Sequence, residues 1–193
     1  MELRPLMTRA AEAPITVVQG IGPDQLALPT PCTEYDVRAL LNHLIHWTGA
    51  RSEGAARKTP PTEPPAEGHD FTAEPDWAER YAAGVRAAAA AWSEPAAWEG
   101  DTGIAKAAAM PARFVGGMMF AEVLLHAWDL AAATGQKFSI DDELAQALFD
   151  QAAAMAETAR QYGAIGPEVA VPETAPPLDR ALGLAGRDPA WTP

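Results

Sequence analysis

The chain has 193 residues, of which 48% are hydrophobic and 21% are charged, as in a globular protein with one sizeable core. Its 26 acidic and 14 basic residues give a formal net charge of -12, which argues against nucleic acid and anionic lipid as partners. The amino-terminal MELRPLMTRAAEAP has no apolar signal core, and no stretch holds about 18 uninterrupted apolar residues. We therefore expect a cytoplasmic protein without a membrane span.

Apolar residues at helical spacing predict the first two helices. The first pattern covers residues 3–18, with Pro14 as an expected kink or break. The spacing of Thr33 and Asp36 resembles a capping box, which predicts a second helix that begins near Glu34. The main apolar stripe of this helix consists of Val37, Leu40, Leu41, Leu44, Ile45 and Thr48.

Three further helices are predicted in the rest of the chain. Residues 58–68 are too rich in proline for a helix and predict an exposed loop, after which residues 76–92 fit a third helix. A fourth helix covers about 111–134, and a fifth begins after a cap in residues 139–142. From residue 162 the chain is rich in Pro and Gly, which predicts an extended strap over the helices.

The predicted fold class is all-α. Strand signals are weak, and the connections imply antiparallel neighbours, so we expect a four-helix bundle with an extended carboxy-terminal strap. The length predicts a single domain that spans residues 1–193.

The fourth predicted helix carries three ionisable side chains in the apolar run FAEVLLHAWDLAAATG, residues 120–135. Such groups on a buried face are costly unless they are paired or bind a metal. Glu122 and His126 are four residues apart and project from one face, and Asp129 follows one turn later. A Glu and a His on one helix supply two of the three protein ligands of a zinc site, so the third must come from another helix.

Among the other histidines, His43 is the best candidate for the third ligand. With Leu41 and Leu44 at the centre of the second helix's apolar stripe, His46 falls nearly opposite, whereas His43 falls at the stripe's edge. His69 lies in the charged, proline-rich linker, where a solvated side chain is expected. Spacing alone does not separate a metal site from a structural Glu and His pair.

Several neighbouring residues have structural interpretations. Cys32 is the only cysteine, which excludes an intramolecular disulfide and a cysteine-based zinc cluster, and we interpret it as a structural residue. Asp129 can accept a hydrogen bond from a ligand histidine or pair with an arginine of a neighbouring helix, and the sequence leaves both open. We expect Trp47 and Trp128 to form core or pocket walls, and the Met118 and Met119 pair to serve packing.

Three segments, PTPCTEYDVRALLNHLIHW, AEVLLHAWDLAAATG and APPLDRALGLAGRDPAW, resemble the DinB-like superfamily in their order and separation. The likeness covers almost the whole chain and points in particular to the actinobacterial branch related to the metal-binding domain of mycothiol-dependent maleylpyruvate isomerase. That family binds one divalent metal inside a four-helix bundle. The matching ligand positions are His43, Glu122 and His126, and the resemblance implies zinc, with nickel as the alternative.

The resemblance also implies thiol chemistry. Three protein ligands leave an open coordination position where a thiol would be deprotonated, and mycothiol is the cosubstrate expected in this branch. The expected activity is S-transfer or isomerisation through attack on an activated double bond or an epoxide. The isomerase's further carboxy-terminal domain has no counterpart here, which argues against maleylpyruvate isomerisation itself.

Two other functions stay open at the level of the sequence. The same ion could hold hydroxide in a metal-dependent hydrolase, or the chain could be a non-catalytic helical module that binds a small ligand or a protein. The identity of the electrophile and the oligomeric state, with a homodimer among the alternatives, are also open.

Overall fold

The structure, a computed structural model, describes residues 2–59, 68–104 and 108–193 and is all-α, as predicted. Its helices are α1 (Met7–Gln19), α2 (Val37–Thr48), α3 (Ala50–Arg57), α4 (Trp77–Trp92), α5 (Ala112–Thr134), α6 (Asp142–Gln161) and α7 (Pro177–Leu184). In the described part, strands β1 (Asp101–Thr102) and β2 (Met110–Pro111) form one antiparallel pair. Residues 60–67 of the predicted loop lie outside the described residues.

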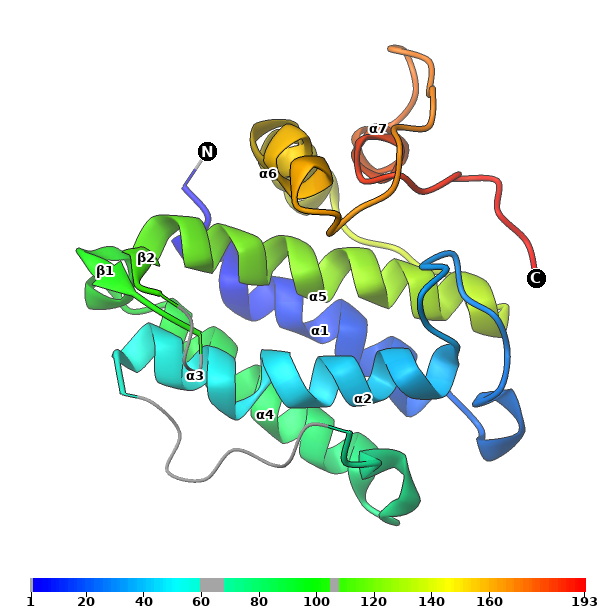
Figure 1. Cartoon of the computed structure of the whole chain (residues 1–193), viewed down its shortest axis with the longest axis horizontal. Coiled ribbons are helices and arrows are strands. Elements are labelled where there is room, and N and C mark those ends of the chain that lie inside the picture. Colours follow the sequence, from blue (N-terminus) through cyan, green and yellow to red (C-terminus); the bar gives the residue numbers. More distant parts are fainter. Residues whose placement is uncertain (1, 60–67, 105–107) are drawn as a thin grey trace.

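Helix α5 is the central element of the fold. It lies between α1 and α2 on one side and α6 on the other, and α4 packs against α1 and α2 and completes the bundle (Figure 1). The length and the mean hydropathy of 1.3 of α5 would suit a membrane span, but 78% of the window concerned is buried inside the protein. Because both sides of α5 are covered, its apolar composition is accounted for by its place in the core.

The second helix begins at Val37, three residues later than predicted. Its N-cap is Asp36, whose Oδ1 accepts a hydrogen bond from the backbone N of Ala39 at 2.7 Å, while Thr33 lies outside the helix in a turn. The prediction of a start near Glu34 was therefore wrong. A carboxylate in the N-cap position satisfies a free N–H group directly, so the local cap overrides the capping-box spacing.

Two features of the bundle helices differ from the sequence pattern. Helix α1 continues through Pro14, so the break that was one of the two expectations there does not occur. Helix α3 was not predicted, and it begins directly after Gly49, which ends α2. At this point the chain passes close to α4. A Cβ added to Gly84 of α4 would lie only 3.2 Å from the Cα of Gly49.

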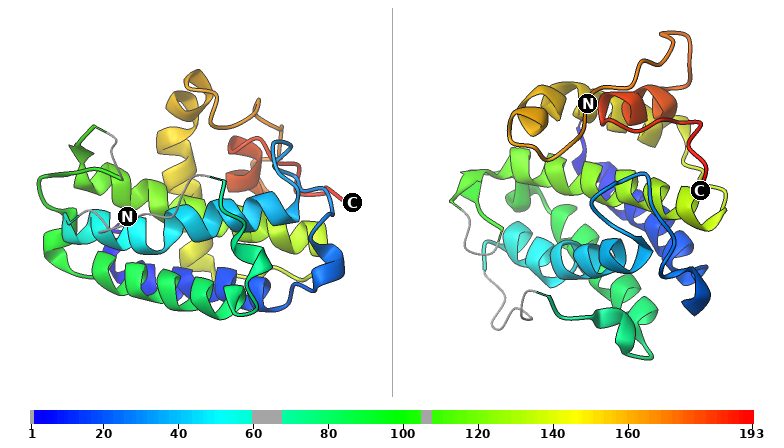
Figure 2. Two further views of the ribbon diagram at one scale, coloured as in Figure 1. Left: turned by 60° about the horizontal axis from the view of Figure 1, so that its bottom comes forward. Right: turned by 45° about the vertical axis from the view of Figure 1, so that its right-hand side comes forward.

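The carboxy-terminal segment is only partly the extended strap that the sequence predicts. It contains α7, which packs against α6 on the outer side of α5 (Figure 2). The preceding stretch is extended and is tied to α7 by a hydrogen bond from the backbone N of Val169 to the carbonyl of Gly183, at 3.0 Å. A Cβ on Gly183 would lie 2.6 Å from the Val169 oxygen, so glycine permits this approach. Pro177 in the first turn of α7 is a normal helix start.

Candidate metal centre

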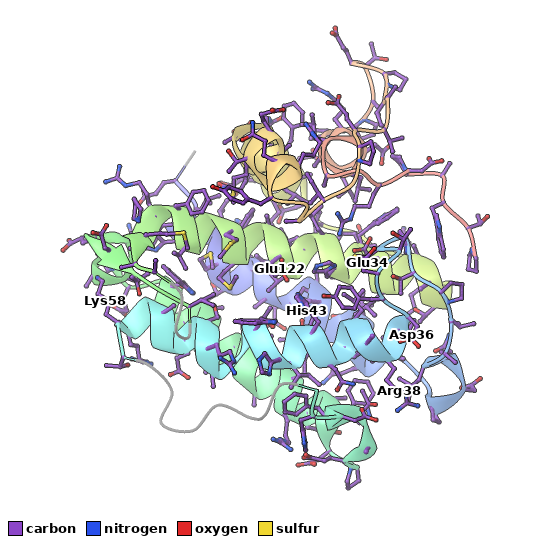
Figure 3. The ribbon with its side chains drawn as sticks, in the orientation of Figure 1. Glu34, Asp36, Arg38, His43, Lys58 and Glu122 are labelled. Carbon is purple, nitrogen blue, oxygen red and sulfur yellow. The ribbon has the colours of Figure 1, made fainter. Side chains whose placement is uncertain are left out.

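Three donor atoms from α2 and α5 converge inside the bundle. His43 on α2 and Glu122 on α5 point toward each other (Figure 3), with Nε2 of His43 2.6 Å from Oε1 of Glu122. Nε2 of His126 lies 3.5 Å from the same oxygen, and the two imidazole centroids are 5.4 Å apart. One ligand atom from each residue lies within 4.8 Å of the other two. The structure thus brings together the three residues that the sequence selects.

The position of His43 follows from the packing of α2. Leu40, Leu41 and Leu44 are completely buried and fix the face that α2 turns to the core. His43 lies at the edge of this face, with its side chain 22% exposed. On α5, Glu122 and His126 are one turn apart, and their side chains are 23% and 10% exposed. The centre is therefore close to solvent but is not on the open surface.

Asp129 makes both contacts that the sequence left open. Its Oδ2 lies 2.8 Å from Nδ1 of His126, and Arg187 donates to Oδ1 at 3.2 Å and to Oδ2 at 2.8 Å. An ionised carboxylate can only accept, so Nδ1 of His126 carries the proton in this bond. Nε2, the other ring nitrogen of His126, is the one that faces Oε1 of Glu122.

A second ring nitrogen is held in a similar way on α2. The hydroxyl of Tyr35 lies 3.4 Å from Nδ1 of His43, and the two ring centroids are 5.2 Å apart. Tyr35 belongs to the turn before α2 and packs against the core. This contact orients His43 with its Nε2 toward Glu122.

The charges at the centre are mutually compensated. Burial by itself would raise the pKa of Glu122, but the charge of His126 and the hydrogen bond to His43 outweigh burial and hold this pKa at about 2. The pKa of Asp129 is also lowered, because Arg187 and His126 outweigh the effect of its burial. Burial acts to lower the pKa of Arg187, but its pairing with Asp129 raises it. Both carboxylates are therefore anionic at neutral pH and available as acceptors or ligands.

Arg187 is a neighbour of the candidate centre that the sequence pattern did not indicate. It follows α7, is 7% exposed, and also donates from Nη1 to the carbonyl of Ala185 at 2.7 Å. The signal in the sequence was the segment GRDPAW, which supported the family resemblance without indicating a contact with Asp129. The two residues are 58 positions apart, so only the folded chain brings them together.

Cys32 lies nearer to the centre than its structural interpretation implied. One ligand atom each from Cys32, His126 and Asp129 lies within 4.8 Å of the other two. Burial raises the pKa of the Cys32 thiol, which keeps it protonated at neutral pH. A neutral thiol is a poor nucleophile, so this contact agrees with packing rather than with attack on a substrate.

The remaining histidines lie away from the three converging donor atoms. The His46 ring contacts the rings of Trp47 and Phe71, with centroid distances of 4.9 and 6.5 Å. His69 is exposed, and its Nε2 lies 2.9 Å from Oε1 of Glu74. Trp47 is partly buried against the core, and Trp128 is buried in it, as predicted.

A cavity of about 430 Å³ adjoins the centre between α5 and α6. Glu122, His126 and Arg187 lie in its wall. The rest of the described wall is mostly apolar, with Gln151, Thr158 and Tyr162 as its polar side chains, and includes Met118, which the sequence assigned to packing. The centre therefore has an adjoining space in which a small molecule could lie.

The donor set fits a divalent cation with three protein ligands. Two imidazole nitrogens and one carboxylate oxygen are a common set for catalytic zinc sites, which keep a further position open. Histidine ligands normally have their other ring nitrogen bonded to a carboxylate or another polar group, as His126 and His43 have here.

Comparisons with known proteins place the chain in a family. Residues 7–131 match the model for the mycothiol maleylpyruvate isomerase N-terminal domain, a region that includes all three converging residues. Two Mycobacterium tuberculosis proteins, uncharacterized protein Rv0738 and uncharacterized protein MT0763 from another strain, are each 34% identical over 194 residues, covering 95% of this chain and 97% of theirs. No solved structure matches the chain significantly. The chain therefore belongs to the family of the mycothiol maleylpyruvate isomerase N-terminal domain.

Proposed function

We propose that the protein binds one divalent metal ion, zinc before nickel, through His43, Glu122 and His126, and that it catalyses a mycothiol-dependent S-transfer or isomerisation. The observation that carries the proposal is the convergence of two Nε2 atoms and one Oε1 atom within 4.8 Å. The family name supports mycothiol as the thiol. A bound divalent ion would supply an open position and favour the deprotonated form of an exogenous thiol.

The chain's own residues have distinct tasks in this proposal. Asp129 holds Nδ1 of His126, which fixes the tautomer and the ring orientation, and Arg187 in turn holds Asp129. Tyr35 supports His43 in the same sense from the turn before α2. In an addition to an activated alkene, the sulfur bonds to one carbon, the π bond breaks, and a proton is taken up by the other carbon. No side chain of the chain is needed as the nucleophile, which agrees with the protonated state of Cys32.

An assay of thiol consumption tests the catalytic part of the proposal. The zinc-loaded protein is mixed with mycothiol and a panel of activated alkenes and epoxides, with and without a chelator. We expect turnover only with thiol present, loss of turnover on chelation, and no effect of His69→Ala, which alters an exposed residue outside the centre. Because a metal lowers the pKa of a bound thiol, the rate should persist below the pKa of the free thiol.

Other outcomes of this assay favour the other functions. Equal turnover without any thiol would contradict the thiol-dependent reaction and favour a metal-dependent hydrolase. Failure of the whole panel together with failure to bind mycothiol would favour a non-catalytic binding module.

A further inference from the structure

The cavity between α5 and α6 has the size of a small-molecule site. Its volume of about 430 Å³ falls within the range of about 300–1,000 Å³ that is usual for ligand pockets. Its wall combines residues of α5, including Glu122 and His126, with residues of α6 and of the segment that follows α6. A molecule in the cavity would therefore lie against the candidate metal ligands.

The cavity offers no free cation to an anionic ligand among its described lining residues. Arg187 is the one lysine or arginine there, and it is engaged by both oxygens of Asp129 and by the carbonyl of Ala185. Glu122 places a carboxylate in the same wall. A carboxylate bound in the body of the cavity, out of reach of an ion held by His43, Glu122 and His126, would lose its hydration without gaining a partner, which is costly.

The remaining wall favours an apolar occupant. Its described side chains are mainly alanine, methionine and other apolar residues, among them Met110, Phe114, Met118, Leu125 and Met155. Methionine side chains are flexible and polarisable, and they adapt to ligands of different shape. Gln151 is turned toward its own helix, where its Nε2 donates to Sδ of Met155 at 2.6 Å.

The rim of the cavity carries an exposed aromatic residue. Tyr162, directly after α6, lines the cavity and is 85% exposed, and it is the one large hydrophobic side chain so exposed in the described part of the chain. Its ring can therefore contact a molecule that enters the cavity.

We infer that this cavity binds an uncharged, largely apolar small molecule, the acceptor of the thiol, and that it discriminates against carboxylate substrates such as the dianion of maleylpyruvate. The inference rests on the proposed function for the role of this molecule as acceptor. The claim that the cavity binds an uncharged, apolar molecule rests only on the shape and the charges of the cavity. A polar thiol cosubstrate would approach the centre from outside this apolar space.

A fluorescent probe tests the inference in the full chain. The probe is phenylnaphthylamine, which is uncharged and becomes fluorescent in apolar sites, and its titration should saturate. Ala152→Phe fills the cavity from α6, where Ala152 is 6% exposed, and should weaken probe binding about tenfold or more, about 1.4 kcal/mol. Ala153→Phe adds the same ring at the next residue, which is exposed, and should leave binding unchanged.

A pair of competitors tests the charge preference. Naphthamide should displace the probe, and naphthoate, which has similar size but carries a carboxylate, should displace it about tenfold less well. Equal competition by both compounds, competition by neither, or equal probe binding in wild type and Ala152→Phe would overturn the inference. If circular dichroism shows that Ala152→Phe is unfolded, Ala156→Leu, which fills the same wall one turn further on, replaces it.

His43→Ala separates this inference from the proposed function. His43 does not line the described wall of the cavity, so the variant should bind the probe as the wild type does while losing the metal. Metal binding without probe binding would refute the cavity inference alone. Probe binding in a wild-type protein that takes up no metal would refute the proposed function alone.

Discussion

Arg187 and Asp129 form a buried ion pair of two hydrogen bonds, 3.2 and 2.8 Å long, which joins the segment after α7 to the carboxy-terminal half of α5. Asp129 is completely buried, and its second contact is with Nδ1 of His126. A carboxy-terminal residue thereby reaches a candidate metal ligand through a single intermediate side chain. The stability of the fold and the geometry of the centre are coupled at this pair.

Arg187→Met should be strongly destabilising. It removes one partner of a buried pair and leaves the Asp129 carboxylate uncompensated, which usually costs about 3–5 kcal/mol of the free energy of unfolding. Urea denaturation monitored by circular dichroism measures the change. Arg86→Met is the matched control, because Arg86 pairs with Glu12 on the surface, and it should remain close to wild type. Equal free energies of unfolding for the two variants would show that the buried pair contributes no more to stability than the surface pair.

Asp129→Asn should weaken metal binding without removing a ligand. Loss of the charged acceptor at Nδ1 of His126 should reduce metal affinity by about 10–100-fold, as is usual for partners of histidine ligands. Competition with a chromophoric chelator measures the affinity. Asp70→Asn, which alters an acidic residue that contacts α2 away from the centre, is the control. An Asp129→Asn protein with wild-type affinity would mean that this carboxylate does not orient the histidine.

Asp70 should make the fold sensitive to acid. Hydrogen bonds from the side chains of Thr72, at 2.6 Å, and Asn42, at 2.9 Å, lower the pKa of Asp70 from 3.8 to about 2. A lowered pKa in the folded state means that the contribution of Asp70 to stability is fully present above pH 3.8 and is lost as the pH falls toward about 2.

Asp70→Asn tests this pH dependence. Urea midpoints of the wild type and the variant should differ at neutral pH and should converge as the pH approaches about 2. A difference that stays constant over this range would show that ionised Asp70 does not stabilise the folded chain.

The start of α2 gives a prediction about local structure. Asp36→Ala removes the side chain that caps Ala39 N and should lower the free energy of unfolding by about 0.5–2 kcal/mol. Thr33→Ala should change it by no more than about 0.5 kcal/mol, because Thr33 lies outside the helix. Thermal denaturation compares the two variants. A larger loss of stability in Thr33→Ala than in Asp36→Ala would favour Thr33 as the cap, as the spacing in the sequence suggested.

The sequence predicts the main helices from local signals, which are an apolar period in α2 and the proline and glycine punctuation of α5. The apolar stripe of α2 and the i, i+4 spacing on α5 are local properties, so they place His43 at an inward edge and put Glu122 and His126 on one face. The observed contact of His43 with Glu122 follows once α2 and α5 are neighbours.

Features that depend on distant contacts could not be predicted from the sequence. The pattern around Asp129 allowed either a histidine or an arginine partner, and only the position of Arg187 after α7 shows that it has both. Helix α7 is short and lies in a proline-rich segment, and such segments usually predict extended chain. Pro177 is nevertheless a normal residue for the first turn of a helix. The junction of α2 and α3 at Gly49 lies against α4, and no local sequence pattern indicates this contact.

Metal content tests the central claim most directly. The wild type, His43→Ala, His126→Ala and His69→Ala are purified in the same way, supplied with zinc, desalted and measured by elemental analysis. The account predicts about one zinc per chain in the wild type and in His69→Ala, and a loss of stoichiometric zinc in the other two variants, each of which lacks one of three ligands. Equal zinc content in all four proteins, or none in the wild type, would contradict it.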